Sequence, residues 1–164
     1  MVRTSDGETS TVSDLKQGIG ATRGGKFIAA VDPGLMTGVA VWDCTLSLAP
    51  YTMQLDTDEF YTWVKDTLVD AWFPYDIVCE AFVISQRTVR GSFQPWSLEH
   101  IGLLRWAAWL RKHHFTLQQA SAAKRFVTND RLKSADWYVP GQDHANDALR
   151  HLYLYALERR IITL

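Results

Sequence analysis

The sequence lacks any apolar run near the roughly 18 residues that a membrane-spanning helix needs, and its N-terminus lacks the basic and then apolar pattern of a secretory signal. It has only two cysteines, Cys44 and Cys79, and they do not have zinc-finger spacing. Because both lie in apolar, strand-like stretches, we expect free, buried thiols in a reducing compartment rather than a disulfide. We therefore expect a soluble, cytoplasmic protein with no membrane partner.

The chain also has little net charge, a formal −1 at pH 7, so its total charge does not indicate a polyanionic partner. Its charges are nevertheless unevenly distributed. Residues 43–80 hold eight acids and the single base Lys65, whereas residues 84–133 hold nine Lys or Arg against Glu99 and Asp130. The second region could bind a polyanion, although solvated faces of unequal charge explain the pattern equally well.

Large apolar residues are scarce in residues 1–25, which are rich in Ser, Thr and Gly. Such a segment buries too little surface to offset its ordering entropy, so we predict a disordered tail, or residues that precede the true start site. Residues 26–164 hold most of the apolar residues and are long enough for one domain with its own core. We predict a single domain over this range.

Apolar periodicity within that domain predicts alternating strands and helices. Helical spacing begins at Thr57 and should end at Pro74, and Ser97 is placed to cap the next helix. Three strands, then helix, strand, helix, strand and helix, is a mixed α/β order. The predicted strands are FIAAVD (27–32), TGVAVWD (37–43), LSLAPYTMQL (46–55), YDIVCEAFVI (75–84) and FTLQQA (115–120); helices are predicted over 57–73, 98–114, parts of 121–138, and 144–160.

The helix over 98–112 is apolar on nearly all sides, with few polar positions besides Glu99, His100 and Arg105. A helix of this kind is covered on more than one side. The domain core can cover one side, so we hypothesise a homodimer in which a second subunit covers another. We interpret Trp106 and Trp109 as part of this dimer helix, Trp42, Trp63 and Trp72 as lying on regular apolar faces, and His100, His113 and His114 as structural or surface residues.

Two acids interrupt strands that are otherwise apolar: Asp32 ends FIAAVD before Pro-Gly, and Glu80 lies within DIVCEAFVI. Burying a carboxylate costs several kcal/mol unless it is paired, protonated or bound to a cation. Taken singly, Asp32 is explained by hydrogen bonds to the amides of its turn. Glu80 alone is explained by an arginine partner about as well as by a functional role. Taken with acids further along the chain, they indicate a divalent-metal site, because adjacent carboxylates repel one another without a cation.

The stretch GQDHANDALRH (141–151) places Asp143, His144, Asp147 and His151 at the start of an amphipathic helix. At about 100° per residue, all four can face outward on one side while the apolar residues face the core. Asp143 precedes the apolar period and is placed to cap the helix. His151, a full turn inside, is interpreted as a surface or phosphate-side residue. Geometry alone does not choose the ligands.

Three stretches together resemble the acidic motifs of the RuvC-type Holliday junction resolvases of the RNase H-like superfamily, particularly the short versions carried by phages. They are AAVDPGLMTGVAVWD, DIVCEAFVI and DHANDALRHLYLYAL, within residues 27–160. The resemblance implies an α/β, RNase H-like (ribonuclease H) fold with a mixed five-stranded sheet and helices on both faces. For a phage-encoded protein it implies the cytoplasm of a bacterial host. Sugar kinases and actin-like ATPases share the Asp-Pro-Gly strand, but they are longer and need phosphate loops that this chain lacks.

The same resemblance implies an endonuclease that resolves branched DNA, such as four-way junctions and also flaps and forks, with two Mg²⁺ or Mn²⁺ ions per active site. The family's metal ligands match Asp32, Glu80, His144 and Asp147, and a histidine in the set slightly favours Mn²⁺. Lys124 falls where the family carries a lysine near the scissile phosphate, and it completes the candidate catalytic residues.

Candidate DNA contacts come from the same comparison. The loop after the second motif corresponds to one that the family inserts into the junction, where basic residues bind phosphates and an aromatic residue stacks on bases. A solvated basic face explains the lysines before the third motif equally well. Phe82 continues the strand and is expected to pack in the core. The candidate DNA contacts are Arg87, Arg90, Phe93, Lys124, Arg125 and Lys133.

Two alternatives stay open from the sequence. One is a less selective nuclease for flaps, forks or replication intermediates. The other is a non-catalytic DNA-binding module with the same fold, although a chain without the chemistry has no reason to keep costly buried acids. Ribonuclease H and transposases share the metal chemistry, but the Asp-Pro-Gly and the histidine of the third motif point away from both.

Overall fold

The computed structural model describes residues 2–3, 9–10, 27–46, 48–83 and 95–163. Its centre is a mixed sheet of five strands in the order β5-β4-β3-β6-β7, which confirms the predicted fold class. β3 pairs antiparallel with β4 and parallel with β6, and β4 pairs antiparallel with β5 in the predicted meander. The strands are β3 (Phe27–Asp32), β4 (Thr37–Asp43), β5 (Tyr51–Leu55), β6 (Tyr75–Glu80) and β7 (His114–Gln118).

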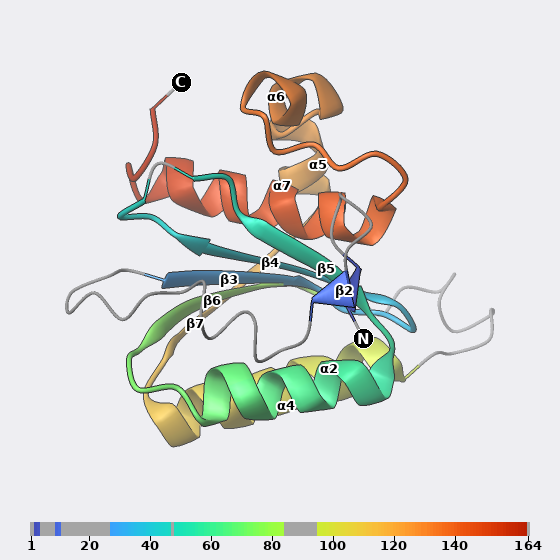
Figure 1. Cartoon of the computed structure of the whole chain (residues 1–164), viewed down its shortest axis with the longest axis vertical. Helices are drawn as coiled ribbons and strands as arrows, with labels where there is room; N and C mark the ends of the chain where they lie inside the picture. Colours follow the sequence, from blue (N-terminus) through green and yellow to red (C-terminus); the bar gives the residue numbers. More distant parts are fainter. Residues whose placement is uncertain (1, 4–8, 11–26, 47, 84–94, 164) are drawn as a thin grey trace.

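Helices cover both faces of the sheet (Figure 1). One layer holds α2 and α4 and lies below the sheet in that view; the other holds α5, α6 and α7 and lies above it. α2 continues directly into η1, a π-helical segment. The bounds are α2 (Thr57–Trp63), η1 (Val64–Val69), α4 (Trp96–Arg111), α5 (Ala120–Phe126), α6 (Asn129–Ser134) and α7 (Asp143–Glu158).

β3 is buried along its whole length, as expected for a middle strand covered by two helical layers. Its alternate residues belong to two separate cores. Ala29 and Val31 pack with the buried residues of α2 and α4, whereas Ile28 and Ala30 pack with those of α7. This double burial fixes the strand on which Asp32 lies.

The predicted N-terminal tail is described only in part. β1 (Val2–Arg3) and β2 (Thr9–Ser10) form a two-stranded antiparallel sheet, and the other residues of 1–26 lie outside the described residues. Disorder of this segment, and a domain that begins at residue 26, stay predictions.

The helix that begins at Thr57 does not continue to Pro74, and Trp72 does not lie on its apolar face. The π-helical segment ends at Val69, where Asp70 donates its N–H to the carbonyl five residues earlier, that of Lys65 (2.9 Å). The wider π turn shifts the phase of the side chains relative to an α-helix. Trp72 lies beyond the end of the helical segment and is 97% exposed, which corrects the prediction for this residue.

Ser97 does not cap α4. The cap position is Pro95, and Ser97 lies inside the helix, where its hydroxyl donates to the carbonyl oxygen of Pro33 (2.7 Å). The prediction was wrong because a more distant acceptor, in the turn after β3, was not visible from the sequence. This hydrogen bond joins the start of α4 to the turn that follows Asp32.

Other sequence predictions are confirmed. Trp42 and Trp63 are buried, as are His100 and His113, whereas His114 is exposed. Both cysteines are free, as predicted; Cys79 is buried, whereas Cys44 is only half-buried, short of the predicted burial. Phe82 packs partly buried against the core, although β6 already ends at Glu80. Among the described residues, no helix has the length and apolar character to cross a bilayer.

Candidate active site

Asp32 and Glu80 meet at one edge of the sheet. Each is the last residue of its strand, and β3 and β6 are adjacent and parallel, with Val31 opposite Cys79. The carboxyl ends of parallel neighbours lie at the same edge, so the two side chains are brought together by register. The sequence prediction that these two acids share a site is consistent with this geometry.

The N-terminus of α7 rests on the same edge because Gly38 leaves room for it. Gly38 pairs with Asp32 across β3 and β4, and a Cβ at this glycine would lie 1.9 Å from the backbone oxygen of His144. A second contact comes from β5, where the side-chain oxygen of Gln54 accepts the backbone N–H of His144 (3.0 Å). The small residue of the Thr-Gly pair therefore lets α7 approach the acids.

Asp32 is nearly buried, with 12% of its side chain exposed, and lies 3.1 Å (Oδ2) from Nδ1 of His144. Burial raises the pKa of the Asp32 carboxyl, and the negative charges of Glu80 and Asp147 raise it further, while the hydrogen bond with His144 acts in the opposite direction. The four predicted metal ligands are thus near enough to interact electrostatically or by hydrogen bonding around Asp32.

Glu80 is bound by His151, which corrects the interpretation of that histidine as a surface residue. His151 is 1% exposed, and its Nε2 lies 3.0 Å from Oε2 of Glu80. Its Nδ1 lies 3.1 Å from Oε1 of Gln118, the residue paired with Glu80 on β7. At this position the polar side of α7 therefore faces the strand ends rather than solvent. The position of His151, four residues after Asp147 on the same helix face, was the available sequence signal.

Asp147 is held by two cations. Its Oδ2 lies 3.0 Å from Nζ of Lys124, and its Oδ1 accepts a hydrogen bond from Arg150. Arg150 also donates to the carbonyl oxygen of Val127 (3.1 Å) and to the side chain of Asn129. The hydrogen bond with Asp147 raises the pKa of Lys124, partly opposed by burial. The sequence had indicated Lys124 but not Arg150.

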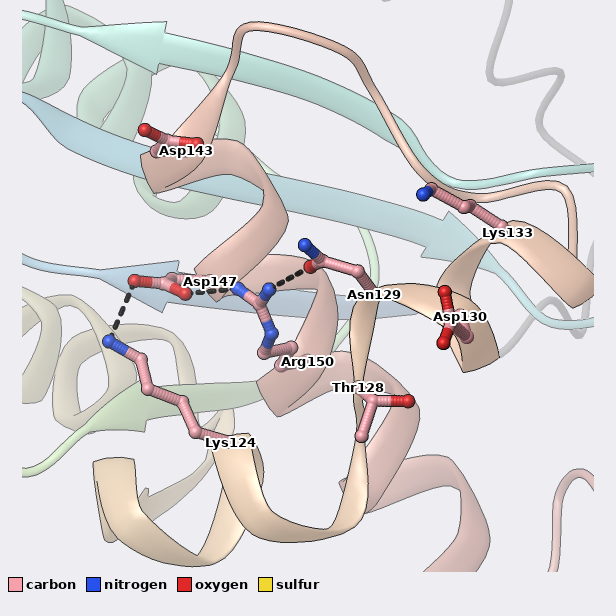
Figure 2. A pocket seen from close by; sticks show the side chains of 8 residues that line it. All are labelled: Lys124, Thr128, Asn129, Asp130, Lys133, Asp143, Asp147 and Arg150. Carbon is pink, nitrogen blue, oxygen red and sulfur yellow. Dashed lines mark hydrogen bonds and ion pairs between the residues drawn. The ribbon is translucent and has the colours of Figure 1, made fainter.

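These residues line a pocket of about 720 Å³ between α5, α6 and the start of α7 (Figure 2). Lys124 and Arg150 point toward Asp147 from two sides in this view. Lys133 lies at the far side, with its ammonium 5.1 Å from the ring centre of Tyr138. The lining residues are Lys124, Thr128, Asn129, Asp130, Lys133, Asp143, Asp147 and Arg150.

Asp143 does not cap α7. It is the first residue of the helix, the cap position is Gln142, and no side chain accepts a hydrogen bond there. Asp143 instead lies in the first turn, where its charge is favourable next to the helix dipole. Its exposed carboxylate lines the pocket of Figure 2.

The donor types fit a hard divalent cation: three carboxylates, with one imidazole. In the part of the chain that the structure describes, however, no three His, Cys, Asp or Glu side chains are arranged to hold one ion. Each acid instead contacts a nitrogen atom, that of His144, of His151, or of Lys124 and Arg150. Ion binding would therefore require at least some of these nitrogens to be displaced.

The remaining candidate DNA contacts separate into two groups. Arg87, Arg90 and Phe93 lie outside the described residues. Lys124 and Lys133 line the pocket, whereas exposed Arg125 lies beside it on α5, with its guanidinium 5.9 Å from the ring centre of Phe126. The described part of the predicted DNA surface is thus formed by α5 and α6.

Comparison with known proteins gives matches by structure. No protein-family model and no curated protein sequence matches the chain significantly. Thermus thermophilus RuvC in complex with a Holliday junction substrate matches with a TM-score of 0.60 and 15% identity, over 83% of this chain and 96% of that one. The chain has the RuvC fold. A second Thermus thermophilus RuvC structure matches with a TM-score of 0.57 and 15% identity, over 82% and 96% of the two chains. The RuvC fold confirms the RNase H-like architecture that the three motifs implied.

Proposed function

We propose that the protein is a divalent-metal-dependent endonuclease that cuts branched DNA, four-way junctions included. The observation that carries this proposal is the convergence of Asp32, Glu80 and Asp147, from two adjacent strands and one helix, on one edge of a sheet with the RuvC fold. The alternative of a non-catalytic module is disfavoured because burial, and then the charges of Glu80 and Asp147, raise the pKa of Asp32, which makes this set of acids costly to keep without a cation. The likeness to short phage versions stays a prediction.

In the proposed mechanism, Asp32, Glu80, His144 and Asp147 would hold Mg²⁺ or Mn²⁺. Two such ions supply an activated water and stabilise the charge that develops on the phosphate. Asp32 is central to this set: it contacts His144 at 3.1 Å and ends the strand beside that of Glu80. His144 contributes a ligand without negative charge, which limits the repulsion among the acids.

Lys124 and Arg150 are proposed to bind the phosphate. Both contact Asp147 and line the adjoining pocket, so with a metal on Asp147 their positive charges would be left for an anion in that pocket. Arg150 is fixed by the carbonyl of Val127, whereas Lys124 is about half exposed and free to reorient. Lys133 and Arg125 extend the positive surface along α5 and α6 for neighbouring phosphates.

A homodimer through α4 is part of the proposal, since paired nicks on opposite strands need two sites related by a two-fold axis. Its outer side exposes Leu98, Trp106, Trp109 and Leu110, with Trp109 76% exposed. A groove beside it, lined mainly by apolar atoms from α2, η1 and α4, has a volume of about 630 Å³. Such an apolar surface is what a subunit interface would cover.

The test uses purified protein with a labelled four-way junction, a flap, a linear duplex and an RNA–DNA hybrid, in Mg²⁺, Mn²⁺ or chelator. We expect metal-dependent cutting that favours the junction, and a loss of about 1000-fold or more in Asp32→Asn. The matched control is Asp58→Asn, an exposed acid on α2 at the other face of the sheet, which should cut normally.

Each outcome selects one function. Equal cutting of the flap and the four-way junction would favour the less selective nuclease. Binding of junctions without cutting in any metal would favour the DNA-binding module. Cutting in chelator, or full activity in Asp32→Asn, would contradict the proposed mechanism.

A further inference from the structure

Glu80 ends a chain of polar side chains that runs along the sheet side of α7. Nε2 of His151 lies 3.0 Å from Oε2 of Glu80, and Nδ1 of the same ring lies 3.1 Å from Oε1 of Gln118. Nε2 of Gln118 in turn donates to Oε2 of Glu158 (3.2 Å). His151 and Gln118 are buried, so this chain connects Glu80 to a surface acid at the C-terminal end of α7.

The hydrogen-bond roles in this chain are determined by its far end. Gln118 donates through its nitrogen to the carboxylate of Glu158, so its oxygen faces His151. Both ring nitrogens of His151 therefore face acceptor oxygens, and a ring that donates to both carries a proton on each nitrogen, because a neutral imidazole has a single N–H. The imidazole is held by two acceptors on opposite sides and has one orientation that satisfies both.

This arrangement limits the positions of one Glu80 oxygen and leaves the other available. Oε2 accepts from His151, whereas Oε1 has no hydrogen bond among the described residues. Glu80 is the last residue of β6, and its side chain is 23% exposed, so backbone pairing alone does not fix its rotamer. A buried donor at Oε2 would reduce this freedom and aim Oε1 at the edge where Asp32 lies.

Another buried histidine offers a comparison. His113 also makes two hydrogen bonds, accepting from the N–H of Tyr75 (3.1 Å) and donating to the carbonyl of Leu68 (2.8 Å). Both partners are backbone groups, and Tyr75 is the first residue of β6, at the opposite end from Glu80. His113 therefore joins backbone segments, whereas both partners of His151 are side chains at the active-site edge.

We propose that His151 is a positioning residue that orients Glu80 for divalent-metal binding, and that Gln118 and Glu158 fix the orientation of the His151 ring. This inference rests on the proposed function, because it assigns a metal to Glu80. Groups that fix the orientation of a metal ligand typically change metal affinity or activity by about 10- to 100-fold.

Two substitutions distinguish the hydrogen bond at Nε2 of His151 from the one at Nδ1. In His151→Gln the side-chain amide reaches the position of Nε2 and can still donate to Glu80. In His151→Asn it reaches only the position of Nδ1, so it keeps Gln118 and loses Glu80. Both remove one hydrogen bond from a buried site, so a purely structural role predicts equal effects.

The experiment is Mn²⁺ titration of the full chain by calorimetry, together with thermal unfolding and junction cleavage. We expect His151→Asn to weaken Mn²⁺ binding by about 10-fold or more and His151→Gln to stay within about threefold of wild type, with similar losses in Tm. The control His113→Gln should lower Tm without changing Mn²⁺ affinity. Gln118→Met, which leaves the ring in place but removes its second acceptor, should weaken Mn²⁺ binding less than His151→Asn, and tests the idea if His151→Asn does not fold.

A coupling measurement excludes an indirect effect. In a Glu80→Gln background, adding His151→Asn should weaken Mn²⁺ binding no further. Equal Mn²⁺ affinity of wild type and His151→Asn, or a full additional loss in the Glu80→Gln background, would overturn the positioning role while wild-type cutting upholds the nuclease. A wild type that neither binds Mn²⁺ nor cuts would overturn the proposed function and this inference together.

Discussion

The helices α4 and α7 have the same length, 16 residues, and cover opposite faces of one sheet, yet they differ in how many and which side chains they bury. α7 buries ten of its residues, including the polar Asn146 and His151. α4 buries five and exposes two tryptophans and two leucines. The apolar residues of α7 are thus nearly all covered by the rest of the chain. In α4, one apolar side is left uncovered by the described residues.

A histidine on each helix shows what this difference means. His100 of α4 is fully buried, but only its Nδ1 is paired, with the hydroxyl of Thr37 (3.0 Å); its Nε2 has no partner in the described structure. Burial lowers its pKa, which favours the neutral ring. His151 of α7 has both nitrogens paired to side chains of the strand ends. α4 is held mainly by apolar packing, and α7 by packing plus directed polar contacts that assemble the site.

The largest expected effect comes from a methyl group between the sheet and α7. Gly38→Ala places a Cβ 1.9 Å from the backbone oxygen of His144 in α7, so the helix must move away from the acids. We expect cleavage to fall about 100-fold and stability to fall by about 1–3 kcal/mol. The measurements are junction cleavage and chemical denaturation.

The matched change is Gly102→Ala in α4, on the other face of the sheet, where an added Cβ meets nothing within 4 Å. Because alanine is the better helix former, this variant should gain about 0.5–1 kcal/mol. A Gly38→Ala variant with wild-type cleavage would remove the distinction between an α7 that assembles the site and an α4 that does not.

The next effect tests the exposed side of α4. Trp109→Glu puts a charge in the proposed interface and should raise the dimer dissociation constant by about 30-fold, the loss of about 2 kcal/mol that a central interface residue contributes. Monomer Tm should not change, since this side chain is 76% exposed. Trp72→Glu, at a residue 97% exposed on another segment, is the control and should leave association unchanged. Analytical ultracentrifugation measures both, and a monomeric wild type would refute the interface.

The smallest effect concerns the loss of folding stability caused by the buried Asp32 carboxylate on the α7 side of the sheet. Because the pKa of Asp32 is raised in the folded state, chiefly by burial, the folded protein binds more protons than the unfolded chain between the unfolded pKa of about 3.9 and the raised value. Stability of the metal-free protein therefore falls as pH rises through that window. Asp32→Asn should therefore be more stable than wild type at pH 7, and equal to it below that window.

Thermal unfolding between pH 3 and 8 in the presence of chelator checks this prediction. Asp58→Asn, on the α2 side, should follow the wild-type curve. If Asp32→Asn is less stable than wild type at pH 7, the hydrogen bond with His144 outweighs burial and repulsion, and the cost assigned to the α7 side is wrong.

Much of the fold was available from local pattern. Alternating and helical spacings are set by the backbone period, so β3, β4, β6 and α7 were predicted within a few residues. The acids Asp32 and Glu80 were visible because a carboxylate inside an apolar strand is unfavourable without a partner. Errors arose where the period itself changes, as in the π-helical segment before Trp72, which a count of helical turns does not anticipate.

The sequence by itself therefore determined the order of strands and helices and the acids that break their apolar pattern. Only the tertiary structure decided the partner of each acid, because a hydrogen bond depends on distances between elements far apart in the chain. His151 is an example. Its position on the helix allows its side chain to face either solvent or the sheet, and the contact with Glu80, 71 residues earlier, places it against the sheet. Asp143 is a second example. Which residue caps a helix depends on the backbone conformation before it, and here the cap position is Gln142.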